Sequence, residues 1–301
     1  MRYNKVGNSE LSVSEIGLGC MSLPEDDPSS ATRIISGALE LGINYFDTAD
    51  LYGRGANESL IGKALRGVRK KIVLATKVGN QWEEGKEGWT WNPSKAHILR
   101  SVEDSLLRLQ TDYIDLYQLH GGTCEDNFEE VVETFELLVQ QGKIRYYGIS
   151  SIRPNVFTAY LQQSGIVSDM MQYSLLDTRP EEFFDEFEKH RVSIIVRGAM
   201  AQGLLLDKVI DKAYLDHNIE EVQTVKDLVT HLGDKYGIGR QSVALKYCLE
   251  KPVVCSALVG IRTFDQLAQL QQSYTDYLEI ADRDMHADFS ALRKIRYREH
   301  R

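Results

Sequence analysis

Four side chains of complementary chemistry lie in the first 120 residues, each at or just after the end of an apolar segment: Asp47, Tyr52, Lys77 and His120. A phenol can donate a proton to a carbonyl oxygen, and a nearby ammonium group favours the phenolate that remains. A carboxylate can hold that ammonium group charged, and an imidazole can donate a hydrogen bond to the same oxygen. Taken singly, each has an ordinary structural explanation, because an Asp after a strand is often a turn residue and a loop Tyr often packs. Together they predict a proton-transfer site if the fold brings them to one place.

The hydrophobic pattern predicts eight short apolar strands, each followed by a helix. We expect strands at 14–19, 43–46, 71–77, 113–119, 144–149, 167–171, 192–196 and 253–259. We expect helices after the polar turn 24–30, at 57–67, from Pro93, at 127–141, from Pro154, after Pro180, at 219–250 and after Thr263, with a helical tail at 276–297. Two of these helices carry capping signals, namely Asn57 with Glu58 in the first turn, and Thr263 with Gln266 at the reciprocal position of a capping box.

This pattern predicts the class of fold. Strands so uniformly apolar suit a parallel sheet that is buried on both faces. Eight strand–helix units in 301 residues favour an α/β fold of the (β/α)8, or TIM, barrel type over an open doubly wound sheet. We expect residues 2–13 to form an N-terminal β-hairpin, and residues 1–301 to form a single domain. A Rossmann fold is disfavoured because Gly17-x-Gly19 lacks the third glycine of its fingerprint.

Composition argues against several classes of partner. The chain is 43% hydrophobic, and its net charge of −9 argues against nucleic acid or an anionic membrane as the main partner. A basic cluster near the C-terminus is expected to be a solvated helix end; its members are Arg293, Lys294, Arg296, Arg298 and Arg301. The first residues lack the apolar core of a signal peptide, and no apolar run approaches the ~20 residues of a membrane span. These features predict a cytoplasmic protein.

The cysteines carry no metal or disulfide pattern. Cys20, Cys124, Cys248 and Cys255 form no C-x-x-C pair, and no pair of histidines accompanies them. We therefore expect small buried thiols in a reducing compartment and no metal site.

In a (β/α)8 barrel the carboxyl ends of the strands converge on one face, where the chemistry takes place. The predicted strands place eight polar side chains at this face of the barrel. They are Asp47, Tyr52, Lys77, His120, Ser150, Gln172, Arg197 and Arg262. We expect these side chains to surround one site.

The chain resembles the aldo-keto reductase family from about Leu11 to about Gln272. The resemblance rests on D-T-A-D-L-Y-G at 47–53, T-K at 76–77, D-Y-I-D-L at 112–116 followed by His120, and G-I-S at 148–150. It implies a (β/α)8 barrel that uses NADP(H) to reduce an aldehyde or ketone, a small-molecule partner, with a catalytic tetrad of Asp47, Tyr52, Lys77 and His120. Within this family, the sequence most resembles the bacterial, potassium-channel-β-like branch.

The resemblance also implies which residues bind the cofactor. It assigns Ser150 and Gln172 to the nicotinamide carboxamide, with Gly19-Cys20-Met21 nearby, and the segment 197–205 to the pyrophosphate. The full set is Gly19, Cys20, Met21, Asp47, Ser150, Gln172, Arg197, Gly198, Met200, Gly203, Gly260, Arg262, Thr263, Gln266 and Gln269, of which the last five lie toward the 2′-phosphate of the adenosine. Four residues depart from the family pattern and leave the preference between NADP and NAD open: Ser151, Arg197 and the pair Gln269-Leu270.

Two other functions remain as alternatives. One is a regulatory subunit that senses nicotinamide cofactors and turns over slowly or not at all. The other is a Schiff-base aldolase that uses Lys77, which a neighbouring Asp47 would disfavour by keeping the amine protonated. The loop 78–92, with Trp82, Trp89 and Trp91, is either part of a substrate pocket or a solvent-capping loop. A monomer is expected, and an oligomer is left open.

Overall fold

Eight parallel strands close into a barrel in the computed structural model, which describes residues 1–83 and 85–301. The strands are β3 (Ile16–Gly19), β4 (Tyr45–Asp47), β5 (Val73–Val78), β8 (Ile114–Leu119), β9 (Ile144–Ile149), β10 (Ser168–Gln172), β11 (Ser193–Arg197) and β12 (Val254–Gly260). β12 pairs with β3, so that the last strand closes the sheet against the first. The predicted (β/α)8 barrel is confirmed.

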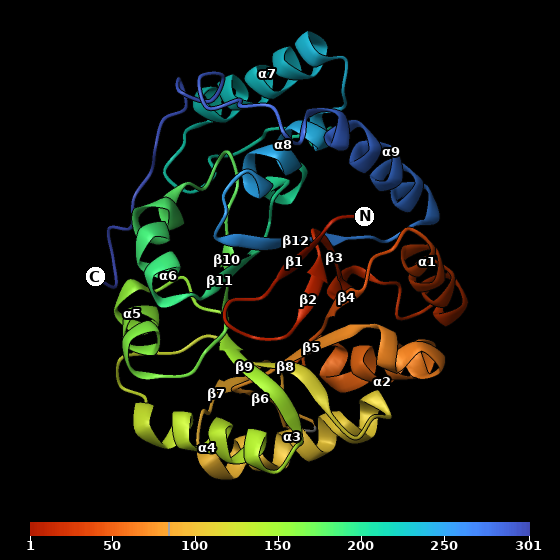
Figure 1. The fold of residues 1–301 in the computed structure, drawn as a ribbon, viewed down its shortest axis with the longest axis vertical. Coiled ribbons are helices and arrows are strands. Elements are labelled where there is room, and N and C mark those ends of the chain that lie inside the picture. The colour runs from red at the N-terminus through yellow and green to blue at the C-terminus, as the bar shows by residue number, and fades with distance from the viewer. Residues whose placement is uncertain (84) are drawn as a thin grey trace.

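Helices surround this barrel on all sides, as Figure 1 shows. Their apolar faces pack on the outward side chains of the strands in one large core. The helices are α1 (Pro28–Glu40), α2 (Ala56–Leu65), α3 (Lys95–Leu109), α4 (Phe128–Gln140), α5 (Pro154–Gln163), α6 (Phe184–His190), α7 (Ile219–Tyr236), α8 (Arg240–Leu249) and α9 (Phe264–Ile280), with short 3-10 turns η1 (Cys20–Ser22), η2 (Tyr52–Gly55), η3 (Arg66–Lys71), η4 (Arg179–Phe183) and η5 (Ala201–Gly203). None of these helices is long and apolar enough to cross a membrane.

The N-terminal hairpin fills one end of the barrel. Strands β1 (Tyr3–Lys5) and β2 (Ser12–Ser14) pair antiparallel, as predicted, and cross the middle of the ring of helices in Figure 1. Val6, Leu11 and Val13 join the second core inside the barrel. The hairpin approaches the strands closely at Gly7, where φ is +52° and an added Cβ would lie 2.4 Å from the carbonyl oxygen of Val167. Only glycine fits there without strain.

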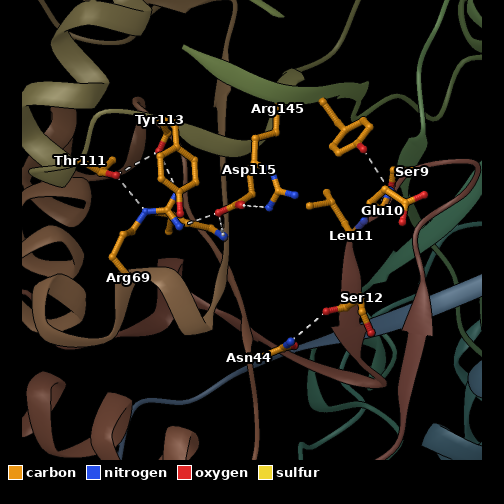
Figure 2. A network of polar contacts seen from close by, with 12 residues as sticks. Ser9, Glu10, Leu11, Ser12, Asn44, Arg69, Thr111, Tyr113, Asp115 and Arg145 are labelled. Carbon is orange, nitrogen blue, oxygen red and sulfur yellow. Dashed lines mark hydrogen bonds and ion pairs between the residues drawn. The ribbon is translucent and has the colours of Figure 1, made fainter. Parts of the chain in front are cut away.

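A polar network ties the strands together at the end that the hairpin fills. Asp115, near the start of β8, is 1% exposed and accepts hydrogen bonds from the guanidinium groups of Arg69 at 2.6 Å and Arg145 at 2.9 Å. It also accepts from the backbone N–H of Leu74 at 3.0 Å. Figure 2 shows these contacts together with Tyr113, whose ring lies under the Arg69 guanidinium. Every oxygen of this buried carboxylate is thus satisfied.

Several predicted helix boundaries are wrong. α2 begins at Ala56 after Gly55, and Asn57 lies inside it, buried, where its side chain bonds the Cys20 carbonyl oxygen and Thr48 rather than capping the helix. α3 begins at Lys95 because Ser94, not Pro93, provides the cap. The helical section 219–250 is two helices, since Gly237 in the left-handed conformation ends α7.

The predicted helical tail at 276–297 is wrong beyond Ile280, where α9 ends. The basic cluster there is not a helix end but a set of ion pairs that hold an irregular tail on acidic residues of η4 and of the segment 216–221. The pairs are Arg293–Glu221, Lys294–Glu181, Arg296–Glu182, Arg298–Asp216 and Arg301–Glu182. Tertiary charge pairing, which local sequence does not reveal, has overridden helix propensity here.

Candidate active site

A buried ion pair lies at the carboxyl ends of the second and third barrel strands. Lys77, 1% exposed in β5, places its Nζ 2.6 Å from Oδ2 of Asp47, the last residue of β4. The same Nζ donates to the carbonyl oxygen of Thr48 at 2.7 Å. Burial lowers the pKa of Lys77, but the charge of Asp47 and its hydrogen bond help to outweigh this effect, and the pKa is raised above its ordinary value. The amine is therefore held as a cation, which argues against a Schiff-base role for Lys77.

Tyr52 stands over this pair. It begins the 3-10 turn η2, and its half-buried ring centroid lies 5.2 Å from the Lys77 Nζ. The turn folds back sharply because Gly53 and Arg54 both adopt positive φ, at 53° and 52°. An added Cβ on Gly53 would lie 2.2 Å from a carboxylate oxygen of Glu25. The Y-G-R-G sequence thus builds a bend that aims the phenol back at the barrel.

His120 faces Tyr52 from the end of β8. The two rings meet edge to face with centroids 5.9 Å apart. Burial and then the charges of Lys77 and Arg197 lower the pKa of His120 to about 3. Its Nδ1 is buried with no hydrogen-bond partner among the residues described. The imidazole is therefore neutral at physiological pH and has a ring nitrogen that no other side chain uses.

A pocket of about 310 Å³ opens beside His120. Its walls include Ser150, Arg153 and Arg197 from the following strand ends, and Trp89 and Trp91 from the loop 78–92. That loop contains two short paired strands, β6 (Asn80–Gln81) and β7 (Thr90–Trp91), which bring Trp91 to the pocket. Of the three tryptophans, Trp82 is not among the lining residues.

The structure brings Ser150, Gln172 and Arg197 to the same barrel end. Arg197 donates from Nη1 to Oε1 of Gln172 at 3.2 Å, and Gln172 donates from Nε2 to the Tyr214 hydroxyl at 3.0 Å. The Ser150 hydroxyl donates to the Met170 carbonyl oxygen at 3.3 Å. These groups therefore form a polar rim around the strand ends.

Two glycines lie side by side where the barrel closes. Gly19 of β3 and Gly260 of β12 are Cα partners in the sheet, and a Cβ on Gly260 would lie 2.5 Å from the Ser22 hydroxyl. The neighbouring Cys20 is fully buried, whereas Met21 is 62% exposed. A side chain at Gly260 would clash with Ser22, which requires glycine at this position.

The segment after β11 has an unusual backbone. Gly198, Ala201, Gln202 and Gly203 all have positive φ, between 46° and 90°. Positive φ at Ala201 and Gln202 costs free energy, because the Cβ of a nonglycine residue crowds the backbone in the left-handed region. Half-buried Met200 lies within this strained turn.

The start of α9 completes the surroundings. The Thr263 hydroxyl caps the helix by accepting from the Gln266 N–H at 3.2 Å. The predicted reciprocal bond is displaced by one residue, because Gln266 Oε1 accepts from the N–H of Arg262 rather than of Thr263. Arg262 and Gln269 are exposed, and within the described chain the Arg262 guanidinium makes no ion pair.

Three polar residues near the site were missed from the sequence. Gln118 donates to Asp47 Oδ1 at 3.4 Å, and its place in β8 two residues before His120 is a signal that strand alternation could have provided. Asp50 is buried, and burial followed by the charge of Glu58 raises its pKa to about 8. Tyr214 lies in an irregular segment and carries no local signal.

Comparison with known proteins of similar fold and sequence shows the family of this chain. A profile of the Aldo/keto reductase family matches residues 15–287. The uncharacterized oxidoreductase YqkF of Bacillus subtilis strain 168 is 46% identical over 309 aligned residues, which cover 100% of each chain. The holo form of aldo-keto reductase AKR11C1 from Bacillus halodurans superposes with a TM-score of 0.89 at 46% identity, covering 100% of this chain and 99% of that one. The glycerol dehydrogenase AKR11B4 from Gluconobacter oxydans gives 0.81 at 25% identity, over 97% of each chain. With these matches along nearly its whole length, the chain belongs to the aldo/keto reductase family of oxidoreductases.

Proposed function

We propose that this protein reduces aldehydes or ketones to alcohols with NADPH, and that Tyr52 donates the proton to the carbonyl oxygen. The observation that carries the proposal is the buried Asp47–Lys77 pair beneath the Tyr52 ring, with neutral His120 on the other side. The family as a whole uses NAD(P)H and acts on small carbonyl compounds. We further propose a cytoplasmic location and a monomer, as predicted from the sequence.

The residues at the barrel end suit a dinucleotide. Gly19 and Gly260 carry no side chain at this barrel end, and Gly260 is exposed, so a dinucleotide can approach their backbone closely. Ser150 and Gln172 offer the hydroxyl and amide groups that a carboxamide requires, and Arg197 adds a planar cation next to them. We assign the strained turn 198–203 to the pyrophosphate, because such turns form concave anion sites. When bound, the nicotinamide supplies the hydride.

The chain's own groups divide the remaining work. Lys77, held cationic by Asp47, stabilises the phenolate that forms when the Tyr52 proton moves to the carbonyl oxygen. His120 cannot be the proton donor at neutral pH because its pKa is about 3, but its neutral ring can donate one hydrogen bond to that oxygen. We therefore assign the role of acid to Tyr52, whose ring lies against both His120 and the Lys77 ammonium group.

The test is Tyr52→Phe. We expect kcat for a neutral aldehyde to fall by about 10²–10⁴-fold, the usual contribution of a positioned general acid, while the Kd for NADPH stays within twofold of wild type. The measurements are NADPH absorbance in steady state and a fluorescence titration of the cofactor. A variant that keeps more than a few per cent of the wild-type rate would remove Tyr52 from the role of acid, and a wild type that reduces no aldehyde would favour a regulatory protein.

The assignment of NADP over NAD has a separate test at Arg262. Its exposed guanidinium beside the N-terminus of α9 can bind the 2′-phosphate through charge-assisted hydrogen bonds. We expect Arg262→Ala to weaken NADPH binding by about 1.5–3 kcal/mol and NADH binding hardly at all. Equal weakening of both cofactors, or of neither, would contradict this assignment.

A further inference from the structure

The pocket beside His120 has a charge opposite to that of the whole protein. The chain carries 44 acidic and 35 basic residues, yet two arginines and no carboxylate line this pocket in the described part of the chain. One of them, Arg197, donates to Gln172 and belongs to the rim that we assign to the cofactor. The other, Arg153, has no role in the function proposed so far.

Arg153 is anchored close to His120 but is not neutralised. Its Nη1 donates to the carbonyl oxygen of Gly122 at 2.7 Å, two residues after His120. Among the residues that the structure describes, no carboxylate pairs with it, and the side chain is half-buried. A guanidinium has five N–H donors, so most of its donors remain unused at the pocket wall.

The arginines on the other side of Arg153 differ in this respect. A neighbouring pocket of about 470 Å³ shares Ile152 and Arg153 with the first and is also lined by Arg179, Arg296 and Arg298. Each of these three pairs with an acid: Arg179 with Asp177 at 2.7 Å, Arg298 with Asp216 at 3.2 Å, and Arg296 with Glu182 at 3.9 Å. Arg153 lies between the two pockets and, unlike these three arginines, has no carboxylate partner among the described residues.

Local structure gives no reason for an arginine at this position. Arg153 is the N-cap residue of α5, where Ser, Thr, Asp or Asn would bond the first free N–H groups, and its side chain makes no such bond. Departures from local rules of this kind are expected at functional sites.

Building on the proposed reductase function, we propose that Arg153 binds an anionic group, carboxylate or phosphate, carried by the carbonyl substrate. A planar guanidinium can bind either oxyanion through two parallel hydrogen bonds. The rings of Trp89 and Trp91 line the same pocket and would cover the apolar part of such a substrate. Arg153 is thus a specificity residue: it acts on the end of the substrate that does not react.

The first experiment compares matched substrates on the wild-type enzyme. The pairs are 4-formylbenzoate with its methyl ester, 5-oxopentanoate with its methyl ester, and 4-formylphenyl phosphate with 4-methoxybenzaldehyde. We expect kcat/KM to be at least tenfold higher for the anion in one or more pairs, through a lower KM. The pair with the larger preference identifies carboxylate or phosphate as the group. Neutral partners that are equal or better in all three pairs would overturn the proposal while leaving the reductase function intact.

The second experiment uses Arg153→Ser. Serine is a good helix N-cap, so we expect this variant to fold with a Tm at or above that of wild type. For the preferred anion we expect kcat/KM to fall by 10–100-fold through KM, with the neutral partner changed less than twofold. Arg298→Ser, which removes a paired arginine from the neighbouring pocket, is the matched control and should match wild type on both substrates. Equal losses on anionic and neutral substrates would show a structural role and overturn the proposal.

A binding measurement separates this proposal from the reductase function. Calorimetric titration with 4-(hydroxymethyl)benzoate and 4-(hydroxymethyl)phenyl phosphate needs no turnover. We expect Arg153→Ser to bind the preferred one at least tenfold more weakly than wild type does. If the wild type reduces no aldehyde but shows this difference, the reductase function fails and the anion site stands. If neither ligand distinguishes the two proteins, the anion site is overturned.

Discussion

Two buried carboxylates, one at each end of the same barrel, have opposite environments. Asp115, near the start of β8, accepts three hydrogen bonds, from Arg69, Arg145 and the backbone of Leu74. Asp47, at the end of β4, accepts one short bond from Lys77 and a longer one from Gln118. Burial raises the pKa of Asp47, and Lys77 opposes that rise.

The surroundings of the two carboxylates show the same contrast. Near Asp47, the described structure leaves His120 Nδ1, Gln118 Oε1 and Asp50 Oδ1 buried without partners. Unpaired buried polar atoms cost stability, and they are tolerated where a ligand can use them. The hairpin end of the barrel holds the fold together, and the opposite end keeps charges in place at the expense of stability. Three substitutions test this division of roles.

The largest expected effect is that of Lys77→Met. It removes the charge that stabilises the Tyr52 phenolate, and we expect kcat to fall by about 10²–10⁴-fold. It also leaves the buried Asp47 carboxylate without a counter-ion, and breaking a buried ion pair in this way typically costs about 3–5 kcal/mol of unfolding free energy. Steady-state kinetics and urea denaturation measure the two losses.

The double variant Asp47→Asn/Lys77→Met is the control for Lys77→Met. It should recover much of the stability, because no buried charge remains, but none of the activity. The activity losses of Asp47→Asn, Lys77→Met and the double variant are compared as activation free energies. A loss in the double variant that equals the sum of the two single losses would show that the pair does not act as a unit.

A smaller effect, on stability alone, is expected for Asp115→Asn. The change breaks two ion pairs at the hairpin end, and we expect the unfolding free energy to drop by about 3 kcal/mol with kcat unchanged within twofold. Asp282→Asn is the matched control, since its pair with Arg2 is exposed and screened by solvent and should contribute little to stability. A clear change of kcat in the Asp115 variant would mean that the two ends are coupled.

The smallest effect concerns the pH dependence of stability at His120. Its pKa is about 3 in the folded protein, below the ordinary value near 6.5, so between these values the unfolded state binds a proton that the folded state does not. Stability from this group is therefore present above pH ~6.5 and is lost as the pH falls toward 3.

His120→Asn removes that contribution. We expect the drop in unfolding free energy between pH 7.5 and pH 5 to be about 1–2 kcal/mol smaller in the variant than in wild type, as measured by urea denaturation. An equal drop in both proteins would show that His120 is not buried as a neutral ring.

Periodicity and strand length were enough to predict the barrel, because each strand is an apolar run followed by an amphipathic helix. β9 was predicted with both its bounds, since Gly142 and Ser150 punctuate it. The errors arose where distant contacts decide local structure. Asn57 reads as a cap but is drawn into α2 by its bonds to Cys20 and Thr48.

Those residues of the candidate site that lie at strand ends could be predicted from the sequence, because the strand ends themselves could be predicted. Asp47, Lys77 and His120 lie at or next to the carboxyl ends of their strands, so the barrel alone brings them together. Nothing in the sequence signalled Arg153. What distinguishes this arginine is the lack of a carboxylate partner among the described residues, and the partners of a charged side chain are known only once the chain is folded. The hydrogen bond between Gln172 and Tyr214 was likewise not predictable, because the two residues are 42 positions apart and only the fold brings them together.

The barrel can close only after its last strand has been synthesised, because β12 pairs with β3, the first barrel strand. The hydroxyl of Ser256 donates to the carbonyl oxygen of Ser14 across 242 residues of sequence, beside the seam where β12 meets β3. At about 5–20 residues per second, the first strand leaves the ribosome roughly 10–50 s before its last neighbour. During that interval one edge of β3 lacks its partner, and such an edge invites pairing with other chains. Production of this protein should therefore be most sensitive to temperature and chaperones in the period before the final strand emerges.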